Sequence, residues 1–287
     1  WNKNNLFIIY MQHKAKKSLG HNFLKSESVL HQIATAGEIK ESDIILEIGP
    51  GKGALTEKLL SFGCKILAVE KDTELYEFLK NKFVKEISSG QFNLISGDIL
   101  SFEITEVLPK FLSGPRISGS LPQPDHSKNL ESLRYKVIAN IPYNITGAIL
   151  KKFLTEESQP QCMVLMVQHE VAKRILAVDG KESILSISVK AYGEPKMITK
   201  VDKRYFSPAP KVNSAVIKIN NINRETFIKN KIDESIFWEI VKKGFAHKRK
   251  KLSGNLKEVS FLKKETLETL GNKRAEDLSL KDWLSLV

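Results

Sequence analysis

The chain has 287 residues, 41% of them hydrophobic, and its 45 lysines and arginines against 33 aspartates and glutamates give a formal net charge of +12. This length and hydrophobic content allow a real core and are typical of one large domain with a smaller one. The positive charge favours a polyanionic partner, because cationic side chains release the counterions condensed on nucleic acids, but it does not choose between RNA, DNA and an acidic membrane surface.

Cysteine content and hydropathy indicate a reducing compartment and no membrane span. Cys64 and Cys162 are the only cysteines, so neither a disulfide framework nor a metal site is predicted, and two idle thiols fit the cytoplasm. No apolar run approaches the roughly 20 residues that a membrane-spanning helix requires. The apolar stretch at residues 6–11 is too short for a signal-peptide core. Met11 could be the natural start, so the residues before it are left out of the functional interpretation.

A basic, glycine-containing arm at residues 14–23 precedes a regular alternation of helical and extended patterns. Apolar residues at helix-like spacing, such as Leu75, Phe78 and Leu79, indicate helices, and short apolar runs indicate strands. This alternation is typical of parallel βαβ units, so we predict an α/β fold with a mostly parallel, doubly wound sheet. The expected strands are 44–48, 65–69, 92–95, 135–139 and 161–168, and the expected helices are 27–36, 54–61, 73–85, 147–154, 171–177 and, helical or mixed, 183–191.

Two regions break this alternation. Residues 110–134 are rich in Ser, Pro, Gly and Asn with little periodicity, which predicts a loop insertion. After residue 206, a strand at 214–219 is followed by Lys-rich helical patterns, and residues 206–287 hold 17 lysines and arginines against 10 acids, an excess of 7. We therefore expect a large domain at 1–205, with the 110–134 insertion, and a small basic helical domain at 206–287.

The run from Val137 to Asn144 carries the most specific chemistry of the chain. A strand of β-forming residues ends in Asn140-Ile141-Pro142-Tyr143. Pro142 stiffens the turn, so the Ile141 carbonyl and the Asn140 side-chain carbonyl can both accept from an exocyclic amine. Tyr143 offers a flat face on which a base can stack. Two acceptors facing an aromatic amine free its lone pair for attack; the plain alternative is an ordinary Asn/Pro turn.

A glycine-rich segment joins the first predicted strand to the next helix. It reads Glu47-Ile-Gly49-Pro-Gly51-Lys-Gly53, and glycines let the backbone turn tightly and approach a ligand. Glu70 ends the second strand about 20 residues later, where an acid can hold both ribose hydroxyls. Asp98 follows the third strand and could accept from an adenine amine. The combination predicts a nucleotide-type cofactor at the carboxyl edge of the sheet.

Two cofactors compete for this segment. Dinucleotide sites usually read G-x-G-x-x-G and place a pyrophosphate on a helix N-terminus, whereas the spacing here is G-x-G-x-G. Lys52 is the only basic residue placed for a pyrophosphate. S-Adenosylmethionine has no phosphate and carries an ammonium that suits the acid Glu47. The residues therefore favour adenosylmethionine over a dinucleotide.

The chain resembles the small-subunit (16S) ribosomal RNA adenine-N6,N6-dimethyltransferase family over nearly its whole length. This family converts two adjacent adenines near the end of that RNA to dimethyladenine. The resemblance implies a Rossmann-like adenosylmethionine-dependent methyltransferase domain at 1–205 and an RNA-binding helical domain at 206–287. The motifs that carry it are 16–24 (KKSLGHNFL), 47–56 (EIGPGKGALT), 140–146 (NIPYNIT), 206–216 (FSPAPKVNSAV), 245–252 (FAHKRKKL) and 274–279 (RAEDLS).

The resemblance also implies roles for individual residues and partners. Asn140, Ile141, Pro142 and Tyr143 would hold the target adenine. The implied partners are the small-subunit ribosomal RNA and the assembling small subunit, and we expect a monomer without a metal or a membrane contact. The residues expected to contact adenosylmethionine are Asn22, Leu24, Gly49, Glu70, Asp98 and Asn140, with Gly51 in the same glycine loop.

The chain departs from the family pattern at two places. His21 stands where the family usually has Gln, which puts any bond of that Gln in doubt. The 110–134 insertion lengthens the gap between Asp98 and Asn140, and we expect it to loop out without disturbing the strands.

Further candidates bind substrate. Phe206 either faces Tyr143 across the flipped adenine or is a core aromatic, and the sequence does not decide between the two. Four consecutive cations, Lys248, Arg249, Lys250 and Lys251, are expected on a helix that meets the RNA backbone.

Two rival functions stay open. One is a large-subunit ribosomal RNA adenine methyltransferase of the macrolide-resistance type, against which the arm and residues 274–279 argue. The other is a non-catalytic RNA-binding or transcription factor of the same fold. The intact turn after Asn140 and the intact glycines argue against lost catalysis.

Overall fold

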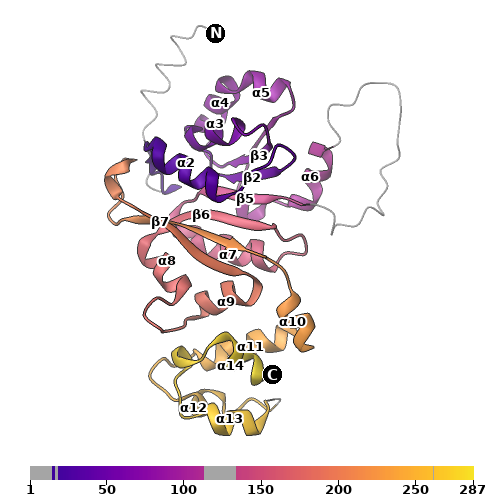
Figure 1. The fold of residues 1–287 in the computed structure, drawn as a ribbon, viewed down its shortest axis with the longest axis vertical. Coiled ribbons are helices and arrows are strands. Elements are labelled where there is room, and N and C mark those ends of the chain that lie inside the picture. The colour runs from indigo at the N-terminus through magenta and orange to yellow at the C-terminus, as the bar shows by residue number, and fades with distance from the viewer. Residues whose placement is uncertain (1–14, 17–18, 113–133, 261) are drawn as a thin grey trace, which may run out of the picture. The chain divides into compact units, whose positions relative to one another are not determined.

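The computed structural model describes residues 15–16, 19–112, 134–260 and 262–287 (Figure 1). They form two compact units: the first comprises the residues up to 169 together with 197–218, and the second comprises 170–196 together with 219–287. The division differs from the single boundary expected at residue 206, because residues 206–218 belong to the first unit and residues 170–196 belong to the second. The domain assignment by function therefore remains a proposal.

The first unit is built on a seven-stranded sheet in the order β4-β3-β2-β5-β6-β9-β7, in which residues 194–196 of β7 and 219–220 of β9 count with the second unit. Adjacent strands of the sheet pair in parallel from β4 to β6, with Ile48 opposite Val69 and Asn140 opposite Met166. The chain winds outward in opposite directions from β2 and β5, which makes the gap between them the switch point where doubly wound sheets bind ligands. The strands are β2 (Ile44–Ile48), β3 (Lys65–Glu70), β4 (Phe92–Ser96), β5 (Lys136–Asn140), β6 (Cys162–Gln168), β7 (Glu194–Val201) and β9 (Ser214–Asn220).

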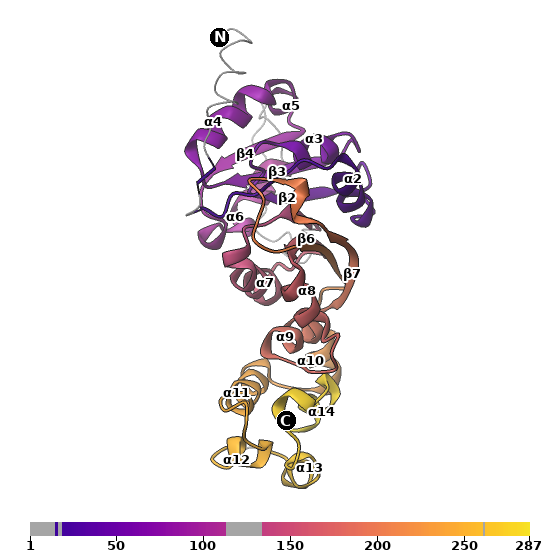
Figure 2. The same cartoon turned by 90° about the vertical axis from the view of Figure 1, so that its left-hand side faces the viewer.

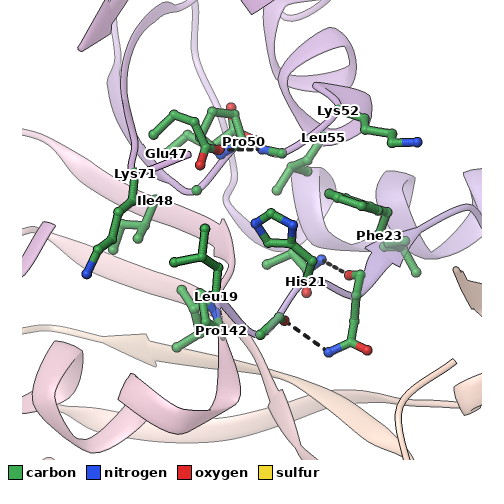
Figure 3. Close-up of a pocket in the computed structure, with 18 of the residues that line it drawn as sticks. Leu19, His21, Phe23, Glu47, Ile48, Pro50, Lys52, Leu55, Lys71 and Pro142 are labelled. Carbon is green, nitrogen blue, oxygen red and sulfur yellow. Dashed lines mark hydrogen bonds between the residues drawn. The ribbon is translucent and has the colours of Figure 1, made fainter. Parts of the chain in front are cut away.

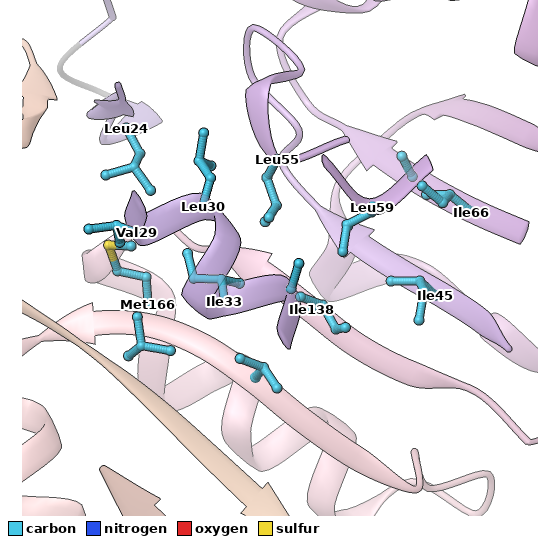
Figure 4. Packing of buried hydrophobic residues seen from close by; sticks show 14 of the residues in the cluster. Leu24, Val29, Leu30, Ile33, Ile45, Leu55, Leu59, Ile66, Ile138 and Met166 are labelled. Atoms are coloured by element: carbon cyan, nitrogen blue, oxygen red, sulfur yellow. The ribbon is translucent and has the colours of Figure 1, made fainter. Parts of the chain in front are cut away.

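Helices cover both faces of this sheet. Figures 1 and 2 show α2, α3 and α4 on one face and α6 and α7 on the other. Every residue of β2 is buried, as a strand covered on both faces requires. Leu30, Ile33 and Leu59 from the helices pack on Ile45 and Ile138 of the sheet (Figure 4). The helices are α2 (Glu27–Ala36), α3 (Ala54–Leu60), α4 (Thr73–Lys82), α5 (Val84–Ser88), α6 (Ile104–Leu112) and α7 (Thr146–Thr155).

The predicted elements agree closely with most of these bounds, but helix α6 was not predicted, and further differences follow. The helix expected at 73–85 is divided at Phe83, whose ring packs on Phe92 with 5.2 Å between the ring centroids. The strand β7 was not predicted, because its burial pattern alternates weakly and Pro195 interrupts it. Residues 110–112 end helix α6 and do not belong to a loop, and 113–133 of the expected insertion lie outside the described residues.

The second unit is helical, as expected. Tyr192 at the end of α9 is buried among aromatic rings; its hydroxyl bonds the Glu234 carboxylate and accepts from the Trp238 indole at 3.0 Å. At the far end, Trp283 stacks on Phe245. The helices are α8 (His169–Leu176, of which His169 counts with the first unit), α9 (Ile184–Tyr192), α10 (Glu225–Asn230), α11 (Glu234–Gly244), α12 (Leu252–Leu256), α13 (Lys264–Leu270) and α14 (Leu280–Ser285).

The four consecutive cations at 248–251 do not lie on a helix, which corrects the sequence-based expectation. Helix α11 ends at Gly244, where a Cβ would lie 2.3 Å from the Trp283 ring, and the chain then turns until α12 begins at Leu252. The Asn255 side chain stabilises this turn by donating to the carbonyls of Gly244 and His247 at 2.6 and 3.2 Å. We call residues 247–251 the basic turn.

Within the described part of the chain, no helix has the length and apolar character needed to cross a membrane.

Candidate active site

A cavity of about 620 Å³ opens where the carboxyl ends of β2, β3 and β5 meet (Figure 3). Its size lies in the range of small-molecule sites. All of its lining belongs to the first unit. The walls come from four parts of the first unit. They are residues 19–25 of the arm, which we extend here to Lys25, the glycine loop at 47–52, the strand ends at 69–71 and 97–100, and the turn at 140–145.

The glycine loop forms one wall and is open to the cavity. Gly49 and Gly51 both have a φ of +61°, a conformation that a side chain rarely adopts. A Cβ at Gly49 would meet no atom within 4 Å, so its absence leaves room for a ligand, whereas a Cβ at Gly51 would lie 3.1 Å from the Phe23 ring. The loop therefore combines a bare backbone toward the cavity with a close fit to the arm.

Glu70 lies at the end of β3 with its carboxylate beside this loop. It is buried, and its oxygens accept from the N–H groups of Gly51 at 3.0 Å and Asp72 at 2.9 Å. Burial raises the pKa of Glu70, and backbone N–H groups, chiefly those of Asp72 and Gly51, oppose that rise. A carboxylate has about four acceptor sites, so these two bonds leave capacity for ligand hydroxyls.

Asp98 follows β4 on the same edge of the sheet. It accepts from the Leu100 N–H at 3.0 Å and from Lys71 Nζ at 2.7 Å, and the Lys71 bond holds the pKa of Asp98 below its usual value. Lys71 was not predicted from the sequence to belong to the site. Its place directly after Glu70, at a strand end, was the signal that could have found it.

Glu47 lies at the bottom of the glycine loop and is almost fully buried. Its carboxyl accepts from the Thr56 hydroxyl at 2.7 Å. Burial raises the pKa of Glu47 to about 8, and the Thr56 bond only partly opposes this. Glu47 is therefore largely neutral at pH 7 in the protein as it stands.

The arm lies over the cavity and is fixed at several points. Lys16 Nζ bonds the Asp72 carboxylate at 2.9 Å, and the Lys16 N–H donates to His21 Nδ1 at 3.2 Å. The centroids of the Phe23 and His21 rings lie 5.2 Å apart. Lys52 Nζ lies over the Phe23 ring, 5.1 Å from its centroid. His21, where the family usually has Gln, thus takes part in holding the arm.

The turn after β5 meets the arm. Asn140 Nδ2 donates to the Asn22 carbonyl at 3.2 Å, so the amide oxygen is the atom of Asn140 that remains to accept from a ligand. Gly20 has a φ of +69°, and a Cβ there would lie 3.3 Å from Pro142. Pro142 has a φ of −61°, and Tyr143, half-buried, bonds the Ser214 hydroxyl. The arm and the turn form one continuous wall.

The structure brings most of the predicted site residues together in the first unit, and Phe206 and the basic turn are not among the residues that line the cavity. Phe206 is 2% exposed and packs in the core cluster, which favours the core alternative, and its contact with the target adenine stays a proposal. The basic turn belongs to the second unit and is exposed. The predicted residues that line the cavity are Asn22, Leu24, Gly49, Gly51, Glu70, Asp98, Asn140, Ile141, Pro142 and Tyr143.

Among the described residues, no group of three or more His, Cys, Asp or Glu side chains could hold a metal ion.

The doubly wound sheet, the bare glycine loop and the acids at the ends of two successive strands define a Rossmann-like methyltransferase that uses S-adenosylmethionine. Residues 12–287 match the family model described as ribosomal RNA adenine dimethylase, and the chain belongs to this family.

Curated relatives and solved structures agree with this assignment. The small-subunit methyltransferase A for ribosomal RNA from Dehalococcoides mccartyi (strain CBDB1) is 36% identical over 95% of this chain and 87% of its own length. The protein of the same name from Fusobacterium nucleatum is 34% identical over 96% of this chain and 98% of its own. A dimethyladenosine transferase from Plasmodium falciparum matches with a TM-score of 0.68 and 26% identity, over 92% of this chain and 95% of that one.

A further solved structure, the 23S rRNA methyltransferase ErmE, matches with a TM-score of 0.67 over 92% of this chain and 97% of that one. Its identity of 21% shows a shared fold alone.

The buried Glu47 predicts a pH dependence of stability. Its pKa is about 8 in the folded chain and about 4.5 in a free chain, so between these values only the unfolded state loses the proton. The free energy of unfolding should fall as the pH rises through this window, by up to about 1.4 kcal/mol per pH unit from this group. Between pH 5 and 8 the free energy of unfolding of Glu47→Gln should therefore rise relative to that of the parent, as measured by urea unfolding.

Asp98→Asn is the matched control for Glu47→Gln. The pKa of Asp98 is lowered from 3.8, so its contribution is constant above pH 5 and its variant should keep a fixed offset from the parent. A fixed offset for Glu47→Gln as well would contradict the neutral, buried state of Glu47.

Proposed function

We propose that this protein transfers methyl groups from S-adenosylmethionine to N6 of two adjacent adenines near the 3′ end of the small-subunit (16S) ribosomal RNA. It acts as a monomer on assembling small subunits in the cytoplasm. The observation that carries this proposal is that the turn from Asn140 to Tyr143 opens into the same cavity as the glycine loop and Glu70. Family membership and the names of the curated relatives support the RNA substrate and the subunit.

The residues around the glycine loop fit the cofactor. Glu70 would hold the ribose hydroxyls and Asp98 the adenine amine. The bare backbone at Gly49 and Gly51, with Asn22 and Leu24 of the arm, would enclose the remainder. When bound, S-adenosylmethionine supplies an electrophilic methyl group on a sulfonium.

The turn would hold the target base. The adenine is unstacked from the RNA and lies against the Tyr143 ring. Asn140 Oδ1 and the Ile141 carbonyl accept from its amine, whose lone pair is thereby freed. Because Asn140 Nδ2 donates to the Asn22 carbonyl, the side-chain oxygen of Asn140 is the atom left to accept from the adenine amine. Positioning of this kind supplies much of the rate in reactions that need little covalent help.

The most direct test uses small subunits that lack the modification. Incubation with the protein and S-adenosylmethionine, followed by primer extension, should reveal stops at two adjacent adenines near the 3′ end of the 16S RNA. Methylation of large-subunit RNA alone, or no methylation together with normal cofactor binding, would contradict the proposal.

Glu70 should contribute strongly to cofactor affinity. Glu70→Ala should weaken binding of S-adenosylhomocysteine by about 10- to 100-fold, the scale of hydrogen bonds to a charged group. Calorimetry measures this. Because Ala also leaves the N–H groups of Gly51 and Asp72 without their acceptor, the 2′,3′-dideoxy analogue, which lacks both hydroxyls, serves as the control ligand. It should bind weakly to the parent and lose little more in the variant; equal losses for both ligands would mean that Glu70 only supports the loop.

Asn140→Ala and Tyr143→Ala should lower turnover far more than RNA binding. Of the RNA, these groups contact only the target base, whereas phosphate contacts elsewhere supply most of the affinity. We expect a fall in kcat of at least about tenfold for each, against a change in subunit affinity below about threefold. Glu77→Ala, which alters an exposed residue of α4 outside the cavity lining, is the control. Normal methylation of saturating subunits by both variants would reject the base-holding role.

The basic turn should contact RNA phosphates. Lys248, Arg249 and Lys250 are exposed, and none of them forms an ion pair within the described part of the chain, while Lys251 Nζ bonds the Asn272 side chain at 3.0 Å. Replacing all four cations by Gln should weaken binding to small subunits. The slope of log affinity against log salt should fall by up to about 0.7–0.9 for each phosphate that the variant no longer neutralises.

The control removes equal charge from other exposed lysines of the second unit: Lys229, Lys231, Lys257 and Lys281. The affinity for S-adenosylhomocysteine should stay unchanged in both quadruple variants, because the cofactor cavity belongs to the first unit. Equal salt slopes for the two variants would show that the basic turn is only a solvated surface.

A further inference from the structure

We propose that Ser214 is a positioning residue for methyl transfer: its hydroxyl tethers the Tyr143 phenol and so fixes the ring on which the target adenine stacks. The inference rests on the proposed function, which assigns the stacking face to Tyr143. It adds a residue that lies outside the cavity lining and outside the turn itself.

The tether joins two distant parts of the chain. Tyr143 follows Pro142 in a turn that is open to the cavity, and the next residue, Asn144, is exposed. Ser214 is the first residue of β9 and has no exposed surface. The Tyr143 hydroxyl and Ser214 Oγ are hydrogen-bonded across 71 positions of sequence. One end of the Tyr143 ring thus borders the cavity and the other end is held by the sheet.

The anchor itself is rigid. The carbonyl of Asn213, directly before Ser214, accepts from the His169 N–H at 3.0 Å, which fixes the start of β9 beside the end of β6. The Asn213 side chain accepts from the Lys203 N–H at 3.0 Å. Strand β9 is the sheet neighbour of β6, next to the strand that carries Asn140. The hydroxyl of Ser214 therefore has a fixed position relative to the base-holding turn.

The bond restricts the ring and does not activate the phenol. Burial raises the pKa of Tyr143 and the Ser214 bond only partly opposes this, so the hydroxyl stays protonated at neutral pH and is no general base. A mobile side chain on a turn loses rotamer entropy when the binding of a ligand restricts it to one orientation. Holding the phenol at its tip removes that penalty before the base arrives, which is pre-organisation in the sense that accelerates catalysis.

The test is a double-mutant cycle with Tyr143→Phe and Ser214→Ala, each of which removes one half of the bond. Each single variant should lower kcat on unmethylated small subunits by about three- to tenfold, the effect of losing one hydrogen bond. The double variant should be no slower than the slower single variant, because the two changes remove the same interaction. The KM for subunits and the affinity for S-adenosylhomocysteine should change less than about twofold, and Ser214→Thr, which retains a hydroxyl, should restore turnover.

Ser158→Ala is the matched control. Ser158 is also buried in the first unit, and its hydroxyl has no hydrogen-bond partner among the described residues, so its loss should leave kcat at the parental value. Thermal unfolding of all variants reports how far removal of a buried hydroxyl destabilises the fold.

Each of the following results would overturn the tether. Parental kcat in Ser214→Ala, or additive losses in the double variant, would show that Ser214 acts only in the fold. A loss in Tyr143→Phe far beyond that in Ser214→Ala would show that the phenol hydroxyl acts in the chemistry. Full turnover by Tyr143→Ala would reject the stacking role and the tether together, whereas an inactive Tyr143→Ala beside a normal Ser214→Ala would reject the tether alone.

Discussion

The parallel pairing of β2 with β3 on one side and with β5 on the other determines where every group of the cavity lies. Parallel strands end at the same edge, so the register that sets Ile48 opposite Val69 also brings Gly49, Glu70 and Asn140 to one edge of the sheet. No single side chain could replace this constraint. A slip of one residue in β3 would turn Glu70 to the other face of the sheet and leave the glycine loop without its acceptor.

The arm links the two halves of the cavity. Its Phe23 ring occupies the space above Gly51, and its Asn22 carbonyl holds the amide of Asn140. The cofactor wall and the base wall are therefore joined by a segment that packs on both. Lys16, bonded to Asp72 at the start of α4, anchors the arm to the same strand end that carries Glu70. A change at one wall is transmitted to the other through a few residues in direct contact.

The sequence predicted what local chemistry specifies and missed what distant packing specifies. The ends of β2 and α2 were predicted to the residue, because apolar runs bounded by glycine or a Ser26 cap are local signals. The basic turn was expected to be helical, and Lys and Arg are good helix formers. Helix α11 instead ends at Gly244, which packs against Trp283, 39 positions away, and whose carbonyl accepts from the Asn255 side chain. The bond between Tyr143 and Ser214 has no sequence signal for the same reason.

The structure also resolves the choice between two cofactors that the glycine spacing left open. Free cations favour a pyrophosphate, and the strand ends at the cavity instead present the acids Glu70 and Asp98. Lys52, the one cation in the glycine loop, lies over the Phe23 ring, and burial lowers its pKa. Lys71 is bonded to Asp98. With its cations engaged by an aromatic ring and a carboxylate, this edge of the sheet suits a ligand that carries hydroxyls, an amine and a positive charge, and it disfavours one that carries two phosphates.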